Sequence, residues 1–167
     1  MHPSPSAVAA ISAEIATIDA ALTEITYLAS RPRQHERLMA VAGLPLERAA
    51  AALLRQLADT EPARPSELAA RLAVEASHVT RQVQQLQTSG HLTRVPDPND
   101  RRAQLIQLTA AGRGAVERMR EANRLGVRHA LRDWPDEDLR RLSVLFRRLV
   151  ENFIAHVDDE FDFQAPA

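Results

Sequence analysis

The stretch PSELAARLAVEASHVTRQVQQLQTSGHLTRVPDPNDRRAQLIQLTAAGR, residues 65–113, predicts two short helices followed directly by a two-stranded hairpin. The first helix is expected to begin at Pro65 and Ser66, because proline is tolerated in the first turn and Glu67 suits the positive helix end. A break at residues 73–75 precedes a second helix that begins near Ala76. Two helices joined by so short a break are typical of a helix-turn-helix.

The second helix of this pair has one apolar and one polar face. Val79, Val83 and Leu86 recur at helical spacing, so we expect them to point into the core. The opposite face carries hydroxyl, amide and guanidinium groups, from Ser77, Arg81, Gln84, Gln85 and Thr88. Such groups hydrogen-bond phosphates and base edges, and neither a bulky hydrophobe nor a carboxylate stands among them.

The hairpin begins after Gly90, which stands where a glycine helix cap is expected. The strand-like run HLTRV follows, and after a turn the run AQLIQL returns, with Ile106 and Leu108 on one face as a half-buried strand requires. The turn carries Arg101 and Arg102 at its exit. The stretch therefore predicts a DNA-reading helix beside a basic hairpin, or wing.

This stretch resembles the MarR (multiple antibiotic resistance regulator) family. The run DPNDRRAQLIQLTAAG is similar to the family's wing, with a D-x-R tip followed by a strand and by L-T-x-x-G. The upstream string S-E-L-A…V-T-R…L…G-x-L-x-R is similar to its helix-turn-helix, and the resemblance covers residues 62–113. It implies a dimeric transcriptional regulator, usually a repressor that a small ligand or an oxidant releases from double-stranded DNA.

The resemblance also implies residue roles. It puts Thr80, Arg81 and Gln84 on the recognition helix, makes Asp100 the residue that orients the wing, and makes Arg102 the arginine of its tip. Together with the exposed faces predicted above, the candidate DNA-binding residues are Ser66, Ser77, His78, Thr80, Arg81, Gln84, Gln85, Arg94, Asp100, Arg101 and Arg102.

The charge distribution agrees with DNA binding although the formal net charge is −1. Residues 64–113 carry seven arginines against four carboxylates, whereas the last ten residues, DDEFDFQAPA, carry four carboxylates and no base. Local charge decides phosphate affinity, so the basic side chains lie where they are needed.

Several functional classes are disfavoured by what the sequence lacks. With no cysteine there is no thiol redox switch, disulfide or cysteine-ligated metal, which removes the peroxide-sensing branch of the family. The six histidines lack metal-site spacing, although a site assembled across a dimer stays open. No catalytic constellation, signal-like segment or membrane-spanning run is present. We expect a cytoplasmic protein that is not an enzyme and needs no cofactor.

The flanks of the reading unit predict oligomerisation. Ile11, Ile15, Ile18, Leu22, Ile25 and Ala29 alternate at spacings of four and three residues, as in a coiled-coil seam. A C-terminal helix opened by Pro135 carries a second stripe, from Leu139, Leu142, Phe146, Leu149, Phe153 and Val157. These stripes favour an intertwined homodimer over packing within the monomer alone, and its interface would include Ile11, Ile15, Ile18, Leu22, Leu149 and Phe153.

The predicted fold is mainly α with a small β-wing, a winged helix-turn-helix flanked by N- and C-terminal dimerisation helices. We expect residues 1–43 to form the N-terminal dimerisation helices and residues 44–113 the DNA-binding region. Residues 114–167 would form the C-terminal dimerisation helices and an acidic tail. Within this plan, residues 43–59 predict a support helix beneath the reading unit, and Thr109 is expected to cap the helix that follows the wing.

Tyr27, Arg31 and His35 follow the N-terminal seam and form a candidate effector site for a small aromatic or carboxylic acid. Such a pocket needs an arginine and a hydrogen-bonding aromatic near apolar walls. Surface or packing roles for these residues, and a protein without any ligand, stay open.

The sequence favours a sequence-specific regulator, a repressor that binds a pseudo-palindromic operator as a homodimer and is released by a small molecule. The alternative is a winged-helix module that binds protein, since winged helices serve both purposes. A protein-binding module should place apolar residues on the second helix, where this chain places Ser77, Arg81 and Gln84.

Overall fold

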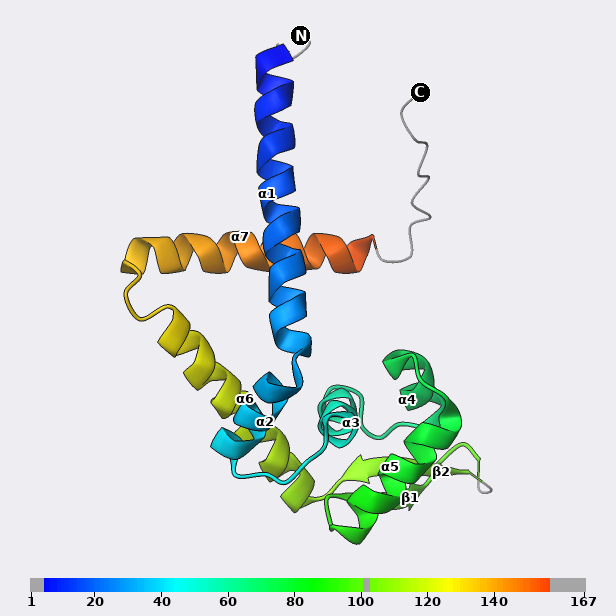
Figure 1. Cartoon of the computed structure of the whole chain (residues 1–167). Helices are drawn as coiled ribbons and strands as arrows, with labels where there is room; N and C mark the ends of the chain where they lie inside the picture. Colours follow the sequence, from blue (N-terminus) through cyan, green and yellow to red (C-terminus); the bar gives the residue numbers. More distant parts are fainter. Residues whose placement is uncertain (1–4, 101–102, 157–167) are drawn as a thin grey trace. The chain divides into compact units, whose positions relative to one another are not determined.

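The computed structural model describes residues 5–100 and 103–156, with side chains from residue 12 on. The elements are α1 (Pro5–Ser30), α2 (Pro32–Ala42), α3 (Arg48–Ala58), α4 (Pro65–Leu72), α5 (Ala76–Thr88), β1 (Leu92–Pro96), β2 (Gln104–Leu108), α6 (Ala110–Ala130) and α7 (Asp136–Ala155) (Figure 1). This mainly helical chain with one small antiparallel sheet confirms the predicted fold class. It divides into two compact units, one reaching Arg124 and one beginning at Leu125.

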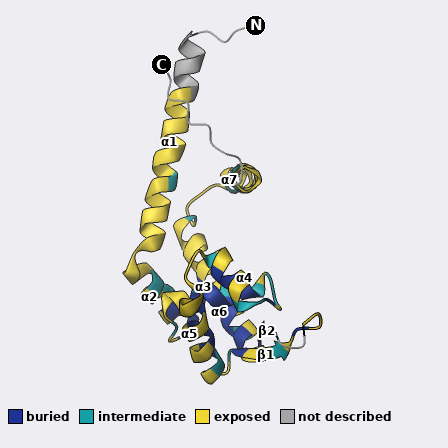
Figure 2. Cartoon of the chain, turned by 90° about the vertical axis from the view of Figure 1, so that its right-hand side faces the viewer, coloured by how far each residue is buried: buried dark blue, intermediate teal, exposed yellow. Residues whose placement is uncertain are grey.

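The core of the first unit joins α3, α4, α5, the hairpin and the first half of α6 (Figure 2). Its largest fully buried side chains are Leu53, Leu54, Leu57, Leu68, Val79, Val83, Leu86, Ile106, Leu108 and Met119. The predicted inner faces of the reading helix and of the return strand are therefore confirmed. Burial of apolar surface contributes roughly 25 cal/mol per Å², so this cluster is the main source of stability for the unit.

The N-terminal seam lies entirely within α1. This helix ends at Ser30, because Arg31 is extended and Pro32 is the first residue of a separate helix. Helix α2 ends at Gly43, whose φ of 62° is the left-handed conformation that glycine adopts without strain. The predicted support helix begins only at Arg48, after an irregular segment that follows this turn. It then buries Leu53, Leu54 and Leu57, as expected.

The hairpin is antiparallel, with Leu92 opposite Leu108 and Arg94 opposite Ile106. Ala63, just before α4, forms an antiparallel bridge to Ile106 of β2. The Ala63 amide donates to the Ile106 carbonyl at 3.2 Å, and the Ile106 amide donates back at 2.9 Å. The start of the helix-turn-helix is therefore attached to the wing by backbone hydrogen bonds.

Thr109 and Gly112 join the hairpin to α6. The Thr109 hydroxyl donates to the Gly90 carbonyl at 2.6 Å and accepts from the Gly112 amide at 3.1 Å, which confirms the predicted cap. A Cβ at Gly112 would collide with the carbonyl of His91, so only glycine permits this close approach. Glu61 fixes the same joint, since its carboxylate accepts from the Leu108 amide at 2.8 Å and from Arg113 at 3.1 Å.

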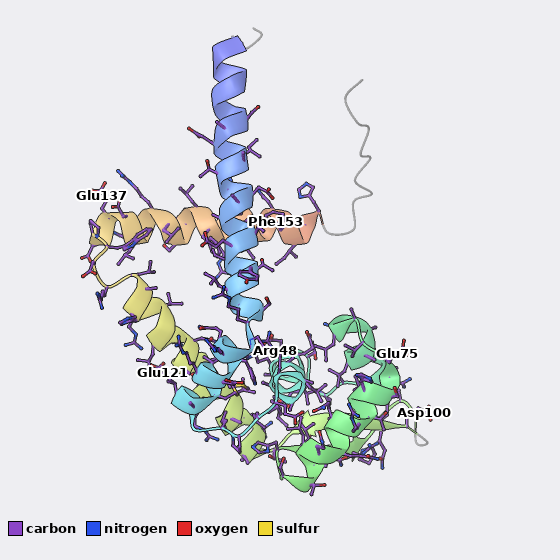
Figure 3. The ribbon with its side chains drawn as sticks, viewed as in Figure 1. Arg48, Glu75, Asp100, Glu121, Glu137 and Phe153 are labelled. Atoms are coloured by element: carbon purple, nitrogen blue, oxygen red, sulfur yellow. The ribbon has the colours of Figure 1, made fainter. Side chains whose placement is uncertain are left out.

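The second unit contains the end of α6 and all of α7. Pro135, in an extended conformation, directly precedes α7, and Asp136, Glu137 and Asp138 occupy its first turn, as the sequence predicted. No described residue of α7 is buried, and Figure 3 marks Phe153 near its end.

Candidate nucleic-acid interface

Helix α5 presents its polar face to solvent because its other face is fixed in the core. Glu75 precedes it in an extended conformation, and Val79, Val83 and Leu86 are buried beneath it. Gln82 is also buried, at 8% exposure, although its polar side chain gave no sign of this in the sequence. The helix cannot rotate without exposing this apolar row, so its outer face has one defined orientation.

The outer face of α5 carries the predicted polar side chains, and all of them are exposed: Ser77, His78, Thr80, Arg81, Gln84 and Gln85. The Thr80 hydroxyl donates to the Ala76 carbonyl at 2.9 Å, which leaves its oxygen free to accept. Within the described chain, no carboxylate forms an ion pair with Arg81, and no large hydrophobic side chain of α5 is exposed. The face therefore offers hydrogen-bonding groups and an uncompensated positive charge.

The wing lies beside this helix. Arg94 of β1 is exposed, and its Nε donates to Oε1 of Gln87 at 3.1 Å, which holds the guanidinium against α5. Figure 3 places Asp100 on the hairpin loop, where it is exposed, and Ser66 is exposed in the first turn of α4. The predicted wing arginines, Arg101 and Arg102, lie outside the described residues.

A buried carboxylate at the base of the wing loop was not predicted. Asp97 is only 5% exposed, and its Oδ2 accepts from Arg64 Nη2 at 2.6 Å and from Arg64 Nε at 3.0 Å. Its Oδ1 accepts from the Asn99 amide at 2.8 Å. These two donors hold the pKa of Asp97 below its ordinary value, the Asn99 amide contributing most, and the same pair raises the pKa of Arg64.

Arg64 stands immediately before α4, where the Glu67 carboxylate accepts from its backbone amide at 3.2 Å. The Arg64–Asp97 pair thus connects the first helix of the helix-turn-helix to the start of the wing loop. Charge-assisted, two-pronged pairs of this kind are stronger and more directional than neutral hydrogen bonds. The angle of the wing relative to α4 is consequently fixed by a side-chain pair in addition to the backbone bridge at Ala63.

The predicted effector cluster is only partly brought together. Arg31 lies over the Tyr27 ring, 4.6 Å from its centre, and donates to its hydroxyl at 3.2 Å. His35 Nε2 lies 2.9 Å from the Leu46 carbonyl. Arg31 and His35 line a cavity of about 590 Å³ in the first unit, whereas Tyr27 does not line it. The remaining lining includes Arg33, Arg37 and Arg55.

Apolar side chains remain exposed on both terminal helices. Ile15, Ile18 and Ile25 of α1 are 61%, 48% and 54% exposed, and Leu22 is half-buried; the side chain of Ile11 lies outside those described. On α7, Phe153 is 54% exposed and Leu149 half-buried, whereas Val157 lies outside the described residues. None of the helices in the described chain is both long and apolar enough to cross a bilayer.

Comparison with known proteins supports the resemblance noted in the sequence. Residues 46–103 match the family model described as the MarR family, which covers α3, α4, α5 and most of the wing. Among curated proteins, the uncharacterized HTH-type transcriptional regulator YxaD of Bacillus subtilis is 29% identical over 109 residues, 65% of this chain and 76% of that protein.

Solved structures extend the similarity to the flanking helices. Transcriptional regulator Tm0710 of Thermotoga maritima aligns with a TM-score of 0.68 and 25% identity, over 84% of this chain and 96% of its own. The apo form of wild-type MarR from Escherichia coli aligns with a TM-score of 0.61 and 20% identity, over 77% and 96%, which indicates a shared fold.

Proposed function

We propose that this chain, whose residues 46–103 match the MarR family model and whose fold is similar to that of transcriptional regulator Tm0710, is a sequence-specific DNA-binding transcriptional regulator. Helix α5 enters the major groove, where Arg81 and Gln84 contact base edges and Ser77, His78, Thr80 and Gln85 support them. Arg94, Arg101 and Arg102 of the wing contact the adjacent minor groove, Asp100 orients the wing arginines, and Ser66 contacts phosphate.

The single observation that carries this proposal is the outer face of α5. A module that binds protein would place exposed apolar side chains there, because the centres of protein interfaces are depleted of charge. Instead the face is polar, and no carboxylate of the described chain pairs with Arg81. This composition fits a polyanion with readable base edges better than a protein surface.

We further propose that the protein acts as a homodimer on a pseudo-palindromic operator, as a cytoplasmic repressor without enzymatic activity. The exposed apolar rows of α1 and α7 support a dimer, since a lone chain would leave Ile15, Ile18 and Phe153 in water. Two-fold symmetry then places two copies of α5 about one helical turn apart on the same face of the duplex.

Release of DNA by a small acid is the proposed regulation. The cavity lined by Arg31 and His35 supports an anionic ligand, and Tyr27 holds Arg31 in its orientation through the ring contact and the hydroxyl. The ligand must bind more tightly to the DNA-free arrangement, because equal affinity for both arrangements would shift nothing.

Selection of binding sites from random duplex DNA tests the proposed function. A palindromic consensus is expected, and Arg81→Ala should cost roughly 1–3 kcal/mol and relax the consensus at one position of each half-site. Arg71→Ala, an exposed arginine of α4 outside the proposed set, is the matched control. Enrichment of no sequence would contradict specific DNA binding. A uniform loss with Arg81→Ala would demote this residue to a phosphate contact.

A further inference from the structure

The cavity of about 590 Å³ has an unusual charge. Helix α2 contributes Arg33 and Arg37, α3 contributes Arg55, and Arg31 lies at the junction of α1 and α2. His35, Gln34 and Asn123 add polar groups, while Leu28 and Leu38 add apolar walls. Among the residues that the structure describes, no carboxylate lines the cavity.

None of these four arginines forms an ion pair with a carboxylate of the described chain. Elsewhere in the same unit, exposed arginines such as Arg113 and Arg120 do find carboxylates, at 3.1 and 3.3 Å. Four like charges that share one cavity repel one another. This repulsion lowers the free energy of unfolding unless an anion is bound.

Arg55 is the most constrained member. Its side chain is half-buried, and its Nη2 is buried without a hydrogen-bond partner among the described residues. Burial in the cavity wall lowers the pKa of Arg55. A buried guanidinium nitrogen without an acceptor is unfavourable, whereas surface arginines keep their hydration.

We propose that this cavity binds a small polyanion, a molecule with two or more negatively charged groups such as a polycarboxylate or a phosphate ester. A single carboxylate would be satisfied by one guanidinium and would leave the remaining charges unopposed. Each further anionic group of the ligand gains a partner arginine, so affinity rises with ligand charge. The inference rests on the proposed function only for its regulatory consequence, and the binding site itself stands without DNA.

Benzoate, phthalate and benzene-1,3,5-tricarboxylate test this proposal, because they share one ring and differ mainly in charge. Calorimetric titration of the full-length protein without DNA, at matched ionic strength, should show affinity rising about tenfold with each added carboxylate. Arg55→Met and Arg37→Gln, the latter at an exposed side chain, should each reduce this rise in affinity to a few-fold for each added carboxylate. Arg71→Gln, which removes an equal charge outside the cavity, should leave it unchanged.

Each outcome separates this inference from the proposed function. Equal affinity for the three acids, tightest binding of benzoate, or an equal loss with Arg71→Gln would overturn the polyanion site. If Arg55→Met does not fold, the Arg37→Gln result decides alone. A tricarboxylate that binds as predicted without releasing the selected duplex would uphold the site and contradict only its proposed regulatory role.

Discussion

The winged-helix region and the terminal helices show how one sequence pattern leads to opposite environments. Both regions repeat apolar residues at helical spacing, yet Leu54 of α3 is fully buried and Ile25 of α1 is 54% exposed. The winged-helix region encloses its apolar rows within one chain, whereas the rows of α1 and α7 remain accessible. Periodicity therefore predicts which face of a helix is apolar, and the number of packed neighbours decides whether the chain alone can cover it.

Truncating one apolar residue in each region should produce the largest difference. Leu54→Ala is expected to lower the free energy of unfolding by about 2–5 kcal/mol, since it leaves a cavity in an enclosed core. Ile25→Ala should cost less than about 1 kcal/mol in dilute protein, and more as the protein concentration rises and the dimer forms. Urea unfolding at two concentrations measures both effects. A concentration-independent loss at Ile25 would place that side chain in an intramolecular core.

A charge placed in the N-terminal seam should break assembly and leave the winged helix folded. Ile18→Glu is expected to weaken dimerisation about a hundredfold, because a carboxylate would lose its hydration in an apolar interface. Thr23→Glu, an exposed position on the same helix outside the seam, is the matched control. Sedimentation velocity reports the assembly, and binding to a palindromic duplex should fall in parallel. A monomeric Ile18→Glu protein that binds the palindrome with full affinity would contradict the dimer.

Local signals made most of the winged helix predictable. Val79, Val83 and Leu86 specify the buried face of α5 by spacing alone, and alternation within β2 specifies its inner residues. The cap at Thr109 was predictable because threonine is a preferred residue at the start of a helix, and the Gly112 amide donates to its hydroxyl. The polar face of α5 was predictable from the same geometry, because the residues on the side of the helix opposite the buried row face solvent.

The contacts that position the site could not be predicted in this way. Arg64 and Asp97 are 33 residues apart, and no repeat or motif connects them. Arg55 lies on the support helix and gave no sequence signal, because its environment depends on α1, α2 and α6 meeting beside it. The exposure of α1 could not be predicted from periodicity either, because a buried apolar row and an exposed one have the same spacing.

Two carboxylates of the wing loop lie in the proposed DNA interface and differ in burial. Asp97 is buried against Arg64, and Asp100 is exposed on the same loop. Asp97→Ala should weaken binding to the selected duplex about tenfold, because the wing loses a charge-assisted anchor, and Asp100→Ala should weaken it a few-fold. Arg64→Ala should match Asp97→Ala, with no added loss in the double variant. Fluorescence anisotropy titration measures all four, and tighter binding by either carboxylate variant would indicate that charge repulsion governs.

The smallest expected effect is the dependence of stability on acid. The Asn99 amide and Arg64 depress the pKa of Asp97 below its ordinary value of 3.8, so its folded form is more acidic than its unfolded form. The resulting stabilisation is fully present above pH 3.8 and is lost as the pH falls through the lower folded value. Wild-type protein should therefore lose slightly more stability than Asp97→Asn when urea midpoints are compared at about pH 5 and about pH 3, on either side of the ordinary value of 3.8. Asp133→Asn, at a side chain that is 83% exposed, is the control. If Asp97→Asn and Asp133→Asn lose equal stability with acid, the buried pair contributes to the orientation of the wing without contributing to acid sensitivity.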